Sequence, residues 1–187
     1  TTRSVPQLRE SIDILDDNNI DVNIGQEQWL ELFQTHTLAR RDILDYLSNS
    51  KIRPQWLSHS GLYPFEEIIL AAPTCKSVCR DLSQLISYDL EQVDSRRIKS
   101  LLLDARLTRN EYALYIINAI DSKDYIKEVI TLLSHPDQDI QEMAFEYLSD
   151  MTRGDLRDEL VNIEKALRAN SSQENIERAK RFFDSKI

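Results

Sequence analysis

The residues most able to carry out chemistry, histidine and cysteine, are few in this sequence. His36, His59 and His135 lie far apart, and Cys75 and Cys79 are four residues apart. A structural zinc site needs four ligands at characteristic spacings, and a disulfide framework needs more cysteines. The sequence therefore predicts no metal and no cofactor. We expect both cysteines to be small, half-buried thiols in a reducing compartment, the cytoplasm.

His59 lies between two serines, Ser58 and Ser60, in a segment expected to be a loop. A Ser–His pair could serve nucleophilic catalysis, but no nucleophile motif accompanies it. The adjacent Glu66 and Glu67 would not share one helix face, and the three glycines form no phosphate-binding loop. We therefore predict that the protein is not an enzyme, and keep catalysis as a minor alternative.

The acidic residues are concentrated in two blocks. Residues 10–31 hold seven acids and no base, and residues 137–159 hold eight acids and two bases, in a chain of net charge −9. Nucleic-acid binding depends on Lys and Arg, and the nearest basic cluster, Arg96, Arg97 and Lys99, is more often a solvated helix face. We expect no nucleic-acid partner. The blocks would instead attract a basic protein, or would simply be solvated helix faces.

The scarcity of turn residues, with three glycines and five prolines, predicts helices joined by short connections. No apolar run approaches the ~20 residues that span a bilayer, so no membrane association is expected. A first helix should start at Pro6. An irregular connector should occupy 51–64, which contains Pro54, Gly61 and Pro64. The other helices are expected near 26–34, 37–47, 64–71, 74–87, 94–105, 108–120, 123–134, 138–151, 155–169 and 172–185.

An internal repeat is the strongest pattern. Residues 101–120 align with 132–151 without a gap, at an offset of 31. In each copy two leucines end one helix, and the next helix carries a small alanine that permits close packing. Thr108 and Glu111 should form a capping box at the start of the second helix. The matched pairs include Leu101 with Leu132, Leu102 with Leu133, Glu111 with Glu142, Ala113 with Ala144, and Ile117 with Leu148.

The segment from Leu132 to Ala144 resembles the turn and second helix of HEAT-type repeats, although Gln141 stands where that family usually carries Arg. Leu70 to Leu82 resembles the leucine-rich repeat variants of bacteria. The resemblance implies an all-α fold, a short right-handed α-solenoid of antiparallel helix pairs. We expect an N-terminal helical cap at 1–65 and the repeats at 66–187. HEAT-like proteins are mostly binding surfaces and scaffolds, so the resemblance implies protein binding.

The best-matched repeat should carry the partner-binding residues. If Ala113 and Ala144 face inward, the exposed side of the two second helices combines a tyrosine with carboxylates, which suits a basic protein. Alternatively, Tyr112, Tyr115 and Tyr147 partly fill the core. The candidate residues are Glu111, Tyr115, Asn118, Asp139, Glu142, Glu146 and Asp150, with Asp13 and Asp17 from the first acidic block.

The size and acidity are similar to those of bacterial immunity proteins, which neutralise nuclease toxins. This similarity implies a non-catalytic inhibitor that covers a basic toxin domain and is monomeric when free. The alternative is a scaffold or adaptor subunit of a larger protein assembly.

Overall fold

A computed structural model of the chain describes residues 10, 25–49, 54–71, 76–89, 93–169, 177, 180–182 and 184. All regular structure in this part of the chain is helical, which confirms the all-α prediction. None of its helices is both long and apolar enough to cross a membrane. The chain forms two compact units, residues 1–94 and residues 95–187. The expected boundary between 65 and 66 falls inside a helix, α4 (His59–Ala71).

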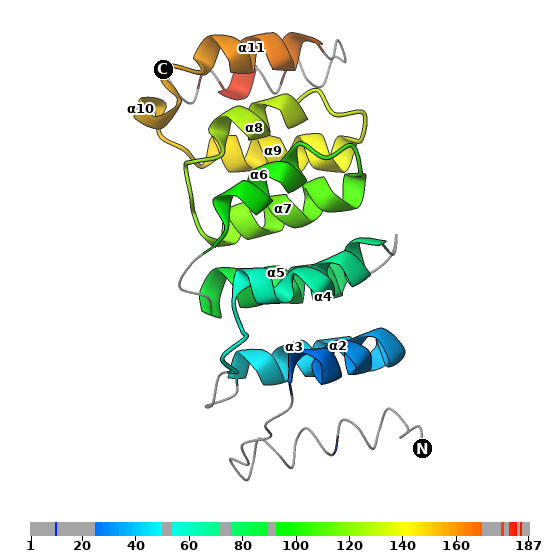
Figure 1. Cartoon of the computed structure of the whole chain (residues 1–187). Helices are drawn as coiled ribbons and strands as arrows, with labels where there is room; N and C mark the ends of the chain where they lie inside the picture. The colour runs from blue at the N-terminus through cyan, green and yellow to red at the C-terminus, as the bar shows by residue number, and fades with distance from the viewer. Residues whose placement is uncertain are drawn as a thin grey trace. The chain divides into compact units, whose positions relative to one another are not determined.

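Unit 1 contains two helix pairs (Figure 1). In the first pair α2 packs on α3, and α4 packs on α5 in the second; between the pairs, α2 contacts α4 and α3 contacts α5. Trp29, Phe33 and Phe65 are almost fully buried at these contacts, and the rings of Phe33 and Phe65 meet edge to face. The elements are α2 (Gln26–Thr35), the short 3-10 helix η1 (Thr37–Ala39), α3 (Arg40–Asn49), α4 (His59–Ala71) and α5 (Lys76–Asp89).

The connector expected at 51–64 is helical from His59 onward. The Ser58 hydroxyl accepts the Gly61 N–H at 3.0 Å, which caps the helix, and Pro64 is accommodated inside α4. Gly61 is required by close packing, because a Cβ there would lie 2.0 Å from the Trp56 carbonyl oxygen. Helix α4 therefore begins five residues before the predicted start at Pro64.

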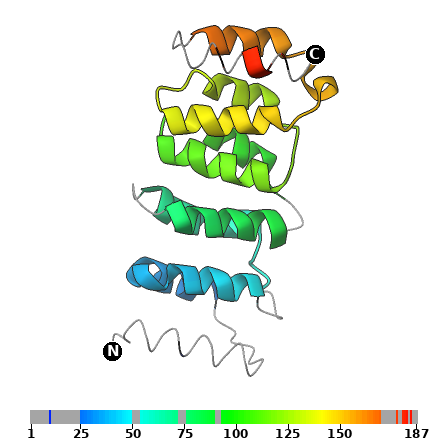
Figure 2. The ribbon, with the colours of Figure 1, turned by 180° about the vertical axis from the view of Figure 1, so that it is seen from behind.

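Unit 2 stacks helix pairs in two layers (Figures 1 and 2). Helix α6 packs on α7 and α8 packs on α9, while α6 also contacts α8, α7 contacts α9, and α8 contacts α11. Helices α6, α8 and α11 form one layer, which we call the first layer, and α7 and α9 belong to the other, the second layer. The elements are α6 (Ser95–Leu102), α7 (Leu107–Ala119), α8 (Ile126–Leu132), α9 (Gln138–Ser149), α10 (Arg153–Leu156) and α11 (Leu160–Ala169).

Positions 31 residues apart in unit 2 have similar burial. The leucines that end α6 and α8 are buried, and Ala113 and Ala144 are both fully buried at the α7–α9 contact. The predicted capping box of Thr108 and Glu111 was wrong, because α7 already begins at Leu107 with no side-chain cap. In the second pair, the Asp137 carboxylate does cap α9 by accepting the Ile140 N–H.

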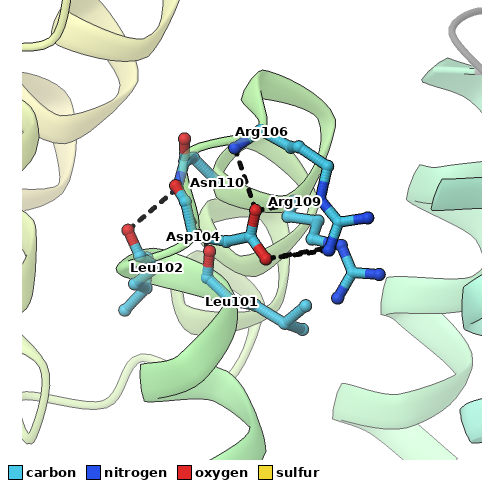
Figure 3. Close-up of polar contacts among 6 residues, drawn as sticks. All are labelled: Leu101, Leu102, Asp104, Arg106, Arg109 and Asn110. Carbon is cyan, nitrogen blue, oxygen red and sulfur yellow. Dashed lines mark hydrogen bonds and ion pairs between the residues drawn. The ribbon is translucent and has the colours of Figure 1, made fainter. Parts of the chain in front are cut away.

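A buried amide closes the turn between α6 and α7 (Figure 3). The Asn110 side-chain N–H group donates to the carbonyls of Leu101, Leu102 and Asp104 at 3.1, 2.8 and 2.9 Å. The last carbonyls of a helix have no partner within the helix, so Asn110 supplies one. Gln141, 31 residues later, donates in the same way to the His135 carbonyl.

Candidate protein-binding face

Helix α7 exposes one narrow stripe. Tyr112, Ala113, Ile116 and Ile117 are fully buried, whereas Asn118 is exposed, and Glu111 and Tyr115 are half-buried. Positions 111, 115 and 118 recur at the spacing of one helix face. Tyr115 donates its hydroxyl to the Glu111 carboxylate at 3.1 Å, which holds the ring along the stripe.

Helix α9 exposes the corresponding stripe. Asp139, Glu146 and Asp150 are exposed and Glu142 is half-buried, while Ala144, Tyr147 and Leu148 face the core. Since α7 and α9 pack side by side (Figure 2) and the stripes occupy positions 31 residues apart, they lie on the same face of unit 2. We call this surface the α7–α9 face.

The α7–α9 face is acidic because its two helices present no exposed base. Together they carry four acids and one base, a net charge of −3. The base, Arg109, is 8% exposed and points to Asp104, with its Nε 3.6 Å from a carboxylate oxygen. The exposed charged side chains of these two helices are therefore all acidic, which favours the approach of a positively charged partner.

The first layer, formed by α6, α8 and α11, carries a net positive charge. Helix α6 carries three bases and no acid, α8 one of each, and α11 two bases and one acid, a net charge of +4. Two of its bases bind acids further along the chain: Lys99 lies 3.3 Å from Glu128, and Lys127 lies 3.9 Å from Glu159. Lys123, in the turn before α8, lies 2.8 Å from Asp155. These ion pairs link successive helix pairs, so much of the positive charge here has a structural role.

The turn between α6 and α7 holds one carboxylate between two guanidinium groups (Figure 3). Asp104 accepts hydrogen bonds from the Arg106 Nε and Nη2 at 3.0 Å each, and from the Arg106 main-chain N–H at 2.9 Å. The Arg106 side chain, with Arg109 behind it, lowers the pKa of Asp104 to about 2. Asp104 therefore stays ionised and fixes the turn.

The structure leaves His59 no nitrogen with which to activate a serine. Its Nδ1 accepts the Asp94 main-chain N–H at 2.9 Å, so the proton of a neutral ring is on Nε2, which lies 2.9 Å from a carboxylate oxygen of Glu66. Both side chains are buried, 1% and 0% exposed. The Ser–His pairing considered as a catalytic alternative is not formed, and His59 instead holds Asp94 on α4.

Seven of the nine predicted partner-binding residues share the α7–α9 face, and Asp13 and Asp17 lie outside the described residues. The alternative prediction, that the tyrosines partly fill the core, holds for Tyr112 and Tyr147, which are buried. Burial also raises the pKa of Tyr147.

Two residues that the sequence reading missed, Leu103 and Leu107, are exposed at the turn between α6 and α7. The sequence did hold a signal for them: both are apolar, whereas the positions 31 residues later carry the polar Ser134 and Gln138. Among the described residues, no cluster of three or more His, Cys, Asp or Glu side chains could hold a metal ion. No protein family matches this sequence, and comparisons with curated proteins and with solved structures give no match either.

Proposed function

We propose that the protein is a non-catalytic inhibitor that covers a basic protein with its α7–α9 face. The observation that carries this proposal is the arrangement of Glu142, Glu146 and Asp150 on one exposed stripe of α9, beside the half-exposed Tyr115 and without an exposed base on either helix. Aromatic anchors contribute much of the energy of protein interfaces, and charge complementarity speeds encounter and selects the partner.

The stacking of like helices in unit 2 supports the resemblance to HEAT-type repeats, and we propose that the pairs form a short solenoid of antiparallel helices. In such a fold each pair buries its apolar side against its neighbours. The second helices then present one continuous, preformed surface. A preformed surface loses little conformational entropy on binding, which suits an inhibitor of high affinity.

A nuclease toxin domain is the partner that fits this surface best. Nuclease domains carry basic surfaces that bind phosphate groups, and a row of carboxylates on α9 can occupy such a surface. The cysteines, with no disulfide spacing, support a cytoplasmic location, where an inhibitor would protect the cell that makes the toxin. Buried Cys79 is a free thiol.

Binding to any basic protein encoded by a gene adjacent to that of this chain tests the proposal. Isothermal titration should show tight binding, and Glu142→Lys/Glu146→Lys should weaken it by roughly 100-fold or more, since truncating or reversing buried interface charges costs several kcal/mol. Asp158→Lys/Glu164→Lys, which makes the same charge change on residues beyond this face, is the matched control. Equal loss in both variants, or no loss in the first, would show that the α7–α9 face is not the site.

A scaffold or adaptor subunit is the second candidate, and the exposed Leu103 and Leu107 favour it. Exposed apolar side chains can mark a contact with another protein, and both leucines lie at the turn between α6 and α7. A scaffold would bind several partners at separate surfaces, so replacing these leucines would remove one partner and leave binding at the α7–α9 face unchanged.

A further inference from the structure

The outer side of α6 and the turn that follows it combine positive charge with apolar side chains. Arg96, Lys99 and Leu103 follow the spacing of one helix face, opposite the buried side that includes Ile98 and Leu102. Leu103, directly after the end of α6, is 60% exposed, and Leu107, the first residue of α7, is 41% exposed. We call Arg96, Lys99, Leu103 and Leu107 the α6 stripe.

The fold does not require leucine at these two positions. The residues 31 positions later, Ser134 and Gln138, are polar in an otherwise equivalent turn. Leu103 and Leu107 are the only two large apolar side chains among the exposed described residues that lie within one helical turn of each other in sequence. Exposed leucine side chains forgo the free energy that burial of their apolar surface would release, so a contact that covers them would be favourable.

The α6 stripe and the acidic α7–α9 face are complementary, yet one molecule cannot join its own two surfaces. Helix α6 packs on α7 and α8, and α9 packs on the same two helices, so α6 and α9 lie diagonally across unit 2. Helix α6 carries three bases and no acid, and α9 carries three acids and no base. The complementary surfaces can meet only between two copies.

We propose that the α6 stripe docks on the α7–α9 face of a second copy. Arg96 then lies against the carboxylates of α9, while Lys99 keeps its ion pair with Glu128. The two leucines cover the half-exposed ring of Tyr115. This contact joins two different surfaces, so it is a heterologous, head-to-tail interface. It replaces the expectation that the free chain is monomeric.

The net charge of −9 opposes association of two copies, but the local contacts act over shorter distances. At physiological ionic strength the Debye length is about 8 Å, so charges elsewhere on the molecule are largely screened while contacting pairs are not. The association is weak, dependent on concentration and sensitive to salt. If the proposed function holds, head-to-tail contact also covers the inhibitory face until a basic partner displaces it.

Sedimentation equilibrium on the full chain tests the interface. The weight-average mass should rise above 21.8 kDa with concentration at low ionic strength and return to it in high salt. Arg96→Glu/Leu103→Ser, the stripe variant, should remain at the monomer mass, as should Glu142→Lys/Glu146→Lys, the face variant. Val161→Ser/Lys165→Glu, which makes the same charge change and removes another exposed apolar side chain on α11, should associate like the unmodified chain.

Mixing the stripe variant with the face variant gives the measurement that decides whether the two surfaces bind each other. The stripe variant retains the acidic face and the face variant retains the α6 stripe, so an equimolar mixture should form a pair although neither associates alone. Circular dichroism melting first establishes that both variants fold. A monomeric unmodified chain at all concentrations, unchanged association of the stripe variant, or a mixture of folded variants that stays monomeric would each overturn the proposal.

Binding of the basic protein separates this proposal from the proposed function. The stripe variant should bind that protein at least as tightly as the unmodified chain, because its α7–α9 face is intact and no longer covered. If the mass measurements follow the expected pattern and no form binds the basic protein, only the proposed function fails. If the basic protein binds as expected and the chain never associates, only the self-association fails.

Discussion

The Asn110 amide donates to the Leu102 carbonyl at 2.8 Å, and so ties the first turn of α7 to the end of α6. The same amide also reaches the carbonyls of Leu101 and Asp104. Asn110 is fully buried, so water cannot replace it as the donor. The turn that presents Leu103 and precedes the α7–α9 face therefore depends on one side chain.

Replacing Asn110 with alanine should destabilise the protein by about 1–3 kcal/mol, because buried carbonyls would lose their donor. Urea unfolding followed by circular dichroism measures this loss. The matched control is Asn118→Ala on the exposed side of the same helix, which should change stability by less than about 0.5 kcal/mol. Equal effects of the two substitutions would contradict a structural role for the Asn110 amide.

The buried pair of His59 and Glu66 gives a second prediction. His59→Phe should destabilise the protein by about 3–5 kcal/mol, because a buried carboxylate loses its ring partner and the Asp94 N–H loses its acceptor. Replacing both partners with apolar groups, as in His59→Phe/Glu66→Leu, should recover part of this loss. Thermal unfolding of the single and double variants measures the coupling. A double variant no more stable than His59→Phe would argue against direct coupling of the pair.

Acid should weaken the link between Lys123, in the turn before α8, and Asp155 of α10. Hydrogen bonds from Lys123 and then from Thr152 lower the pKa of Asp155 to about 2 from its ordinary value of 3.8. A carboxyl whose pKa is lower in the folded state stabilises the fold above its unfolded pKa, and this contribution is lost as the pH falls from about 4 towards 2.

The unfolding midpoint of Asp155→Asn should therefore lie below that of the unmodified chain at neutral pH, and the difference should shrink below pH about 4. Urea unfolding across this pH range measures it. Asp158→Asn, on an exposed neighbour, should show no such pH-dependent difference. A constant difference for Asp155→Asn at every pH would mean that its effect comes from packing and not from its charge.

The sequence alone predicted the local elements that periodicity controls. Apolar residues at helical spacing and few glycines or prolines predicted an all-helical chain, and the 31-residue offset matched Ala113 with Ala144, which the structure buries alike. Prediction from the sequence failed where contacts with other residues determine where a helix begins. Pro64 suggested a break, but the Ser58 cap and the close fit of Gly61 under Trp56 let α4 start earlier. Thr108 suggested a capping box that α7 does not form.

The sequence by itself determined that the carboxylates of residues 137–159 exist and that several share one helix face, because helical spacing is a local property. Only the tertiary structure decided that α9 lies beside α7 and diagonally from α6, since this depends on which helices bury their apolar sides together. It also paired Lys123 with Asp155, 32 residues away. Charges mixed along the chain are thereby separated into a second layer of net charge −3 and a first layer of +4, and that separation underlies both proposals.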